Sequence, residues 1–311
     1  MPANVETMFY VRVAPWHGLG VYVEEALNSE EALEKSGLDW SVIQRPIMTS
    51  TYDPIPGYKA NIRETDNRIL GVVSDRYKIV QNADAFRFTD ALLGEGVRYE
   101  TAGSLNEGRK VWMLAKLPDS YTIMDEQIEP YLVFSNSHDG NSSIRVAMTP
   151  IRVVCQNTLN LALGNAERIW STVHVGDLAH KMDEAHNTLQ LAGRYMSSLG
   201  QEFNRLSQIQ LPDTRVLEYI EMLLPMNEDP TDLHKRNVEQ IREDLKIRYF
   251  DAPDLQHVGR NAYRFVCAVS DFATHAEPLR KTATYRENMF ARTIEGNPLI
   301  DRAYEIVREA A

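Results

Sequence analysis

Hydrophobic positions recur at every second residue through much of the first half of the chain, and at every third or fourth residue through the second half. The clearest stretch of the first kind begins at residue 131. There the apolar runs Tyr131–Phe134 and Ile144–Met148 flank the polar segment 136–143, whose Asn, Asp, Gly and Ser residues favour a turn. We therefore predict a β-hairpin, followed by a strand over 151–155 and a short helix over 157–163.

Similar alternation predicts two more hairpins before residue 130. The paired segments are 58–63 with 68–74, and 97–102 with 109–117. Residues 76–80 are expected to extend the first hairpin as a strand. Between the two hairpins, Asn82 is expected to cap a helix over 83–93 that packs on the sheet.

Weaker signals precede these hairpins. A short helix capped by Asn28 or Ser29 is expected to run to Lys35, and a brief strand is expected over Trp40–Ile43. Residues 53–57 contain two prolines and a glycine, which indicates a turn.

The hydrophobic period changes after Asp177. Apolar residues then follow steps of four and three from Leu178 to Leu206, which is the 3.5-residue repeat of a helix packed lengthwise on a neighbour. The stripe either joins two subunits in a homo-oligomer or packs against another helix of the same chain. Prolines divide the remaining C-terminal residues into predicted helices over 213–224, 231–250, 260–275, 284–294 and 298–310.

The change of period predicts an α+β fold, with an antiparallel-sheet N-terminal domain that carries packed helices and an all-helical C-terminal domain. The expected boundaries give an N-terminal extension packed on the sheet domain over 1–56, an antiparallel β/α core over 57–170 and a helical domain over 171–311. A chain of 311 residues with 43% hydrophobic residues is long enough for these cores.

Composition narrows the class of protein. No window resembles a membrane span or a secretory signal, so the protein is expected to remain in the cytoplasm without membrane contact. Cys155 and Cys267 both lie among apolar neighbours, as buried structural thiols do. The net charge of −11 excludes a chain coated in basic surface. Residues 57–163, however, carry 12 basic and 13 acidic residues, so this middle segment is nearly neutral.

Short catalytic and metal-binding signatures are absent: there is no Gly-rich phosphate loop, HExxH, paired CxxC or GxSxG. His180 and His186 lie six residues apart on the predicted long helix, which disfavours a shared metal. His17, in a Gly-rich loop, is most simply a packing residue. We expect no catalytic residue, no metal site and no cofactor.

The polar segment of the central hairpin contains the group of residues that most resembles a catalytic site. Its residues Ser137, His138, Asp139 and Asn141 are best explained by turn geometry, since neighbours in one turn do not form a hydrogen-bonded relay. Contact with a ligand or nucleic acid is the second interpretation. Catalysis by His138 and Asp139 is the third.

Basic residues with interleaved aromatics mark the predicted strands. Strand alternation places Arg145 opposite the apolar face formed by Ile144 and Val146, and Arg152 follows the same alternation. Such residues either cover a solvated sheet face or hold a single nucleic-acid strand by binding phosphates and stacking on bases. The candidate nucleic-acid-binding residues are Arg145, Arg152, Arg76, Lys78, Arg109, Lys110, Tyr77 and Trp112.

Several segments resemble an uncharacterised family of phage- and plasmid-borne proteins, a domain of unknown function. The segments are PWHGLG, EEAL, GLDWSV, RYKIVQN, SNSHDGNSSIRVAMTPIRVVCQNTL and RNAYRFVCAVSDFATH. The family implies a mobile genetic element in a bacterial cytoplasm. The arrangement of a hairpin, a helix and antiparallel strands is also similar, at the level of fold, to phage single-strand annealing recombinases.

These observations favour a single-stranded DNA-binding protein that anneals strands during phage or plasmid recombination without nucleotide hydrolysis. Two alternatives stay open. One is an interaction protein that inhibits a host defence or regulator through its acidic helical half, and the other is a nucleic-acid-processing hydrolase that uses His138 and Asp139.

Overall fold

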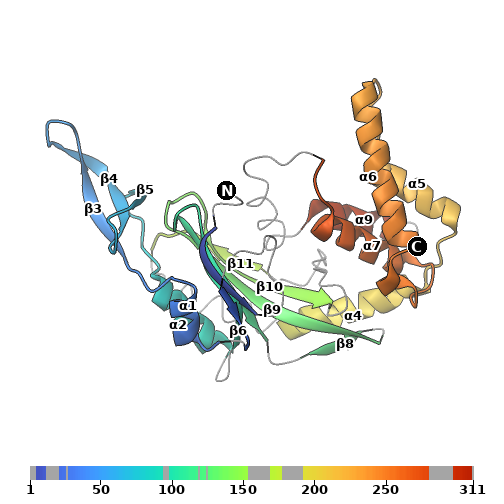
Figure 1. Ribbon diagram of the computed structural model, residues 1–311, viewed down its shortest axis with the longest axis horizontal. Coiled ribbons are helices and arrows are strands. Elements are labelled where there is room, and N and C mark those ends of the chain that lie inside the picture. The colour runs from blue at the N-terminus through green and yellow to red at the C-terminus, as the bar shows by residue number, and fades with distance from the viewer. Residues whose placement is uncertain are drawn as a thin grey trace. The chain divides into compact units, whose positions relative to one another are not determined.

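The computed structural model describes residues 5–11, 21–25, 27–93, 98–117, 120–123, 125–152, 169–176, 192–279 and 297–309. Two β-sheets and two helices occupy the N-terminal part, and the C-terminal part is helical (Figure 1). The predicted α+β class is therefore confirmed. Predictions for His17, Cys155, His180, His186 and the helix over 157–163 lie outside the described residues, as does the helix over 284–294.

The larger sheet has the strand order β11-β10-β9-β7-β6-β1-β2, with β8 paired to β9. Its strands are β1 Val5–Val11, β2 Val21–Val23, β6 Arg98–Leu105, β7 Lys110–Lys116, β8 Tyr121–Ile123, β9 Glu126–Ser137, β10 Ile144–Arg152 and β11 Ile169–Thr172. β1 and β2 run parallel, whereas β6, β7 and β9 pair antiparallel. The predicted hairpins β6–β7 and β9–β10 are thus present.

The smaller sheet has the order β3-β4-β5, with β3 Val42–Met48, β4 Pro54–Arg63 and β5 Ile69–Ser74. The β4–β5 hairpin forms as predicted, and Asn67 has the positive φ of a turn residue. Two predictions are wrong. Pro54–Gly57 belongs to β4 rather than to a turn, because Met48 pairs with Pro54 and the bend falls before it. Residues 76–80 form no strand, since residues 75–76 form a turn and residues 77–80 have no regular secondary structure.

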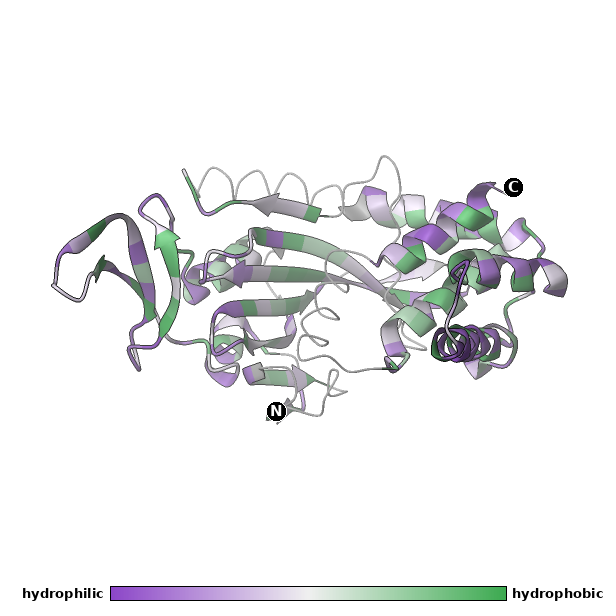
Figure 2. Ribbon diagram, turned by 90° about the horizontal axis from the view of Figure 1, so that it is seen from above, coloured by the Kyte–Doolittle hydropathy of each residue, from purple (hydrophilic) through white to green (hydrophobic). Residues whose placement is uncertain are grey.

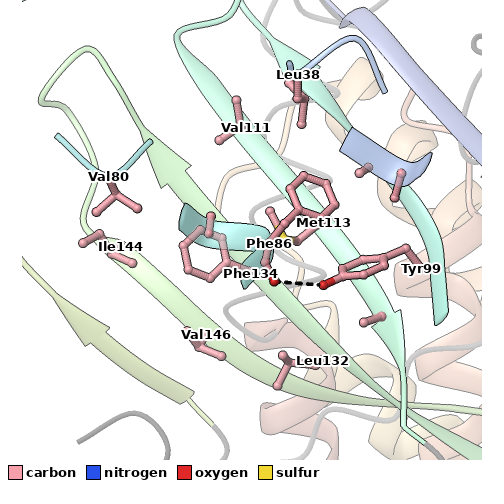
Figure 3. Close-up of a cluster of buried hydrophobic side chains, with 14 of the residues drawn as sticks. Leu38, Val80, Phe86, Tyr99, Val111, Met113, Leu132, Phe134, Ile144 and Val146 are labelled. Carbon is pink, nitrogen blue, oxygen red and sulfur yellow. Dashed lines mark hydrogen bonds between the residues drawn. The ribbon is translucent and has the colours of Figure 1, made fainter. Parts of the chain in front are cut away.

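Two helices belong to the N-terminal part: α1 Ser29–Lys35 and α2 Asn82–Leu93. Asn28 caps α1 as expected, and Glu31 completes a capping box. Side chains from α1, α2 and one face of the larger sheet form a shared core (Figure 3). Within it the rings of Phe86 of α2 and Tyr99 of β6 lie 5.0 Å apart, and the Tyr99 hydroxyl lies 3.2 Å from the Phe86 carbonyl oxygen (Figure 3).

The C-terminal part contains α4 Ala192–Gln208, α5 Asp213–Leu223, α6 Asp232–Phe250, the 3-10 turn η1 Pro253–Leu255, α7 Ala262–His275 and α9 Pro298–Glu309. Hydrophobic and hydrophilic residues alternate along these helices (Figure 2). Of the predicted heptad stripe, Met196, Leu199, Phe203 and Leu206 are at most 1% exposed. The Phe203 ring lies 4.9 Å from that of Tyr263, so this part of the stripe packs within the chain.

The chain divides into two compact units. The first comprises Met1–Pro118, Tyr131–Met148 and Glu167–Ala192, and the second comprises Asp119–Pro130, Thr149–Ala166 and Gly193–Ala311. The domain boundaries at residues 56/57 and 170/171 stay predictions. Cys267 is buried in α7, as expected for a structural thiol. Among the described residues, no helix combines the length and apolar character needed to cross a membrane.

Candidate functional site around the β9–β10 turn

The polar segment between β9 and β10 forms a turn, residues 138–143, that is organised by Asp139. One carboxylate oxygen of Asp139 accepts hydrogen bonds from the Ser137 hydroxyl and from the Asn141 backbone N–H, the latter at 2.9 Å. The other oxygen accepts from the Asn141 side chain at 3.1 Å. Gly140 has a φ of +77°, which glycine adopts without strain. The turn interpretation of Ser137, Asp139 and Asn141 is therefore confirmed.

The turn lies against the smaller sheet. The Asn61 side chain donates a hydrogen bond of 2.7 Å to the His138 carbonyl oxygen. A Cβ atom on Gly71 of β5 would lie 2.5 Å from the Asp139 Cα atom, so only glycine permits this approach. β5 and the β9–β10 turn are consequently in direct backbone contact.

His138 is fully buried and has a structural role. Its Nε2 lies 3.0 Å from Asn82 Oδ1. The Asn82 amide nitrogen donates to the carbonyl oxygens of Leu38 and Trp40, so Oδ1 is the acceptor and Nε2 carries the proton. Burial lowers the pKa of His138 to about 3. Since its side-chain partner is an amide and solvent does not reach it, the geometry gives no support to a hydrolase reaction at His138.

Asn82 therefore does not act as the predicted helix cap. Its side chain bonds to His138 and to two carbonyl oxygens instead of to the first turn of α2. The Ala85 N–H bonds to the Gln81 carbonyl oxygen, which places the start of the helix one residue earlier. The buried His138 thus uses the side-chain amide of Asn82 that the sequence pattern assigned to helix capping.

A second histidine, His174, lies beside the turn and is only 4% exposed. Its ring stacks on that of Tyr77 at 4.4 Å, and the Tyr77 hydroxyl donates to the Ser137 carbonyl oxygen at 2.5 Å. His174 Nδ1 lies 3.0 Å from the Lys78 carbonyl oxygen and must carry the proton. Burial lowers the pKa of His174 and raises that of Tyr77. Both side chains are thus neutral near pH 7.

His174 Nε2 has no hydrogen-bond partner among the described residues, although it is buried. An unsatisfied buried acceptor typically costs about 1–3 kcal/mol. His174 borders a pocket of about 450 Å³ between β5, the β9–β10 turn and residues 173–175. The lining includes Val72, Ser74, Tyr77, Asp139, Ser143 and His174.

His174 was not among the residues predicted from the sequence. The signal was present in Val173-His174-Val175, where one polar residue lies between two β-branched residues as in a strand. In the structure Val173 is 60% exposed and His174 is buried. Exposed and buried side chains therefore alternate as in a strand, but here the polar residue is the buried one.

Five of the predicted basic residues gather around this turn. Arg76 and Lys78 flank Tyr77, and the Lys78 N–H donates to the His174 carbonyl oxygen at 2.7 Å. The Arg109 carbonyl oxygen accepts from the His138 N–H at 2.7 Å, and Lys110 lies opposite Ser137 in the β7–β9 register. Arg145 Nε donates to the Ser143 hydroxyl at 3.3 Å.

Four of these residues form no ion pair within the described part of the chain: Arg76, Lys78, Arg109 and Lys110. Several arginines elsewhere in the described part of the chain are paired. Arg63, for example, binds Glu6 and Asp66 at 2.8 and 2.7 Å. The turn is therefore surrounded by cations whose charge is not neutralised by a neighbouring carboxylate of the described segments.

The remaining candidates are two buried aromatic residues and Arg152. Trp112 is 2% exposed and Tyr77 is 7% exposed, so neither ring offers a face on which an approaching base can stack. Both faces of β7 are covered around Trp112, which strand alternation alone does not reveal. Arg152 ends β10, and its side chain lies outside what the structure describes.

The described residues contain no group of three or more His, Cys, Asp or Glu side chains suited to a metal ion. His174 Nε2 and Asp139 are the only functional groups of that kind that line the pocket among these residues. Two such groups are fewer than a protein metal site normally uses.

The fold and this site define an α+β protein with a cation-rich turn beside a small pocket. The chain belongs to the family described as domain of unknown function DUF932, whose model matches residues 69–294. The match covers β5, the whole β9–β10 turn and most of the helical part. No curated protein and no solved structure matches the chain significantly.

Proposed function

We propose that the protein binds single-stranded DNA around the β9–β10 turn and anneals complementary strands during phage or plasmid recombination in a bacterial cytoplasm. One observation carries the proposal: basic residues from three separate chain segments meet at this turn, and four of them have no ion-pair partner among the described residues. Annealing requires strand binding but no nucleotide hydrolysis, so the proposal involves no cofactor.

Charge argues for a polyanionic ligand. The net charge of the chain is −11, so these cations gathered in one place contrast with the rest of the sequence. The nearby Asp139 carboxylate already accepts three hydrogen bonds inside the turn, which reduces its competition for these cations. Phosphates spaced along a flexible strand can reach several such side chains at once.

Burial of Tyr77 and Trp112 determines what kind of binding is expected. Without these rings as stacking platforms, phosphate contacts supply most of the affinity. Binding should therefore depend steeply on salt and only weakly on base sequence. A single strand is favoured over a duplex because it can bend around a compact turn.

The test compares fluorescently labelled single- and double-stranded oligonucleotides in anisotropy titrations between about 50 and 200 mM salt. Lys78→Ala, Arg109→Ala and Arg145→Ala should each weaken single-strand binding and reduce the slope of log affinity against log salt by about 0.7. The matched control is Lys235→Ala, an exposed lysine on α6 in the other unit, which should leave the slope unchanged. Failure of the intact protein to bind single strands at about 50 mM salt would eliminate the proposal.

A host-factor-binding protein is the second candidate. Residues 164–311 carry 18 basic and 23 acidic residues. Large apolar side chains are exposed there on α5 and α6, namely Met222 at 51%, Leu233 at 62% and Ile247 at 52%. Apolar groups on an acidic surface suit a protein partner. This interpretation becomes the preferred one if single-strand binding is absent.

A further inference from the structure

We propose that the pocket between β5, the β9–β10 turn and residues 173–175 binds one nucleobase that carries an amino group. The inference rests on the proposed function, because the base would belong to the strand held around the turn. The pocket would add a preference for certain bases, whereas phosphate contacts alone would supply affinity without base preference.

The buried acceptor of His174 is the first argument. Its Nδ1 is committed to the Lys78 carbonyl oxygen, so Nε2 carries a lone pair that no donor of the described residues engages. The ring is held by stacking on Tyr77 and by the backbone bond between Lys78 and His174. A rigid acceptor at a pocket wall selects a ligand that brings an N–H or O–H group.

Asp139 supplies a second acceptor. Its Oδ2 accepts one hydrogen bond, from Asn141, and a carboxylate oxygen has room for another. No lysine or arginine lines the pocket within the described residues, so a phosphate or carboxylate group would find no such cation there and would face the Asp139 carboxylate. The lining therefore favours a donor-bearing group and disfavours an anion.

The shape of the lining points to a flat ring. Val72 and Val173 are 58% and 60% exposed at the pocket, and such β-branched side chains give apolar walls for the faces of a ring. A volume of about 450 Å³ lies within the range of small-ligand sites. The amino groups of adenine, cytosine and guanine each carry two N–H donors, one for His174 Nε2 and one for Asp139 Oδ2, whereas thymine offers only its single N3–H.

The surroundings connect the pocket to the strand-binding residues. Arg145 bonds to Ser143, which lines the pocket, and Lys78 bonds to His174 through its backbone. Both residues are thus attached to residues of the pocket lining, and we expect their side chains to bind the phosphates next to a base that enters the pocket. Base and backbone recognition would occur within one site of the first compact unit.

The test uses free nucleosides, which have no phosphate, so it does not depend on the cation cluster. Deoxyadenosine, deoxycytidine, deoxyguanosine and thymidine, which share the same sugar, are titrated into the intact protein and followed by NMR chemical shifts. Amino-bearing nucleosides should bind at least about fivefold more tightly than thymidine, as expected for one additional satisfied hydrogen bond. Equal binding of thymidine, or no binding of any nucleoside, overturns the pocket proposal.

Two variants locate the binding. His174→Phe keeps an aromatic ring on Tyr77 but removes the acceptor, and should abolish the preference over thymidine. Val173→Trp places a large side chain at an exposed position of the pocket wall, which the fold should tolerate, and should weaken binding of all four nucleosides. Asn227→Ala, an exposed loop position in the other unit, is the control and should change nothing. Unchanged nucleoside binding in Val173→Trp would place the site elsewhere.

The outcome separates the two proposals. Nucleoside binding without single-strand binding would retain the pocket and eliminate the strand-binding function. Salt-dependent strand binding without nucleoside binding would retain the strand-binding function and eliminate the pocket proposal. If both proposals hold, Lys78→Ala lowers the salt slope and leaves the nucleoside preference intact. His174→Phe leaves the salt slope unchanged and abolishes the nucleoside preference.

Discussion

The side chains of Asn82 and His138 meet in a buried hydrogen bond of 3.0 Å, which joins the start of α2 to the β9–β10 turn. Asn82→Ala would leave the Nε2–H of the His138 ring and the carbonyl oxygens of Leu38 and Trp40 without this partner. We expect the free energy of unfolding to fall by about 2–3 kcal/mol. Urea denaturation measures the change, and the exposed Asn227→Ala variant should stay within about 0.5 kcal/mol of the parent.

His138 also makes a pH dependence measurable. Burial lowers its pKa from 6.5 to about 3, so between these values the unfolded chain binds a proton that the folded protein does not. Protonation then favours unfolding, and stability falls as the pH falls below about 6.5. From pH 7 to pH 5 this histidine should remove about 2 kcal/mol from the free energy of unfolding. The lowered pKa of His174 acts in the same direction.

Denaturation series at pH 7, 6 and 5 test this expectation. A His138→Gln variant has no titrating group at this position and should show a clearly shallower loss of stability with acid. Identical pH profiles for the variant and the parent would contradict a neutral, buried imidazole.

Leu199 tests the heptad stripe of α4. It is fully buried, and Leu199→Ala should cost about 2–5 kcal/mol because a cavity remains among its neighbours. Ser197→Ala, on the exposed side of the same helix, is the matched control. A cost below about 0.5 kcal/mol for Leu199→Ala would show that this part of the stripe is not packed in solution.

Gly71 tests the contact between β5 and the turn. In Gly71→Ala the new methyl group would lie 2.5 Å from the Asp139 Cα atom and 2.8 Å from its carbonyl oxygen, and backbone atoms cannot move aside easily. We expect a loss of about 1–3 kcal/mol in thermal or urea unfolding. Gly259→Ala has its nearest contact at 3.4 Å and should be much milder. Equal effects of the two substitutions would argue against the close approach.

Local patterns predicted most of the secondary structure. The hairpins β4–β5, β6–β7 and β9–β10 follow from alternation around turn residues, and α5, α6, α7 and α9 follow from the positions of the prolines. The errors at Pro54–Gly57 and at residues 76–80 have a common cause. Strand formation depends on a partner strand, and β3 supplies one for residue 54 whereas no described strand pairs with residues 77–80.

The sequence pointed to the basic residues of the site but not to His174 and not to the arrangement. Arg76, Lys78, Arg109, Lys110 and Arg145 were expected on strands or at strand starts, although residues 76–80 form no strand. Their meeting at one turn depends on contacts between segments far apart in the chain, such as the bond between Arg109 and His138. The burial of Trp112 could not be predicted either, because alternation along β7 says which residues share a face but not whether that face is covered.

Lys78 and His174 are joined by two hydrogen bonds, of which one links their backbones and the other engages the imidazole. Both bonds use backbone atoms of Lys78, so Lys78→Ala keeps them and the imidazole stays anchored. The effects of Lys78→Ala and His174→Phe should therefore be additive in a double-mutant cycle. The main chain of residue 78 would thus hold the group that recognises a base, while its side chain is left to bind a phosphate.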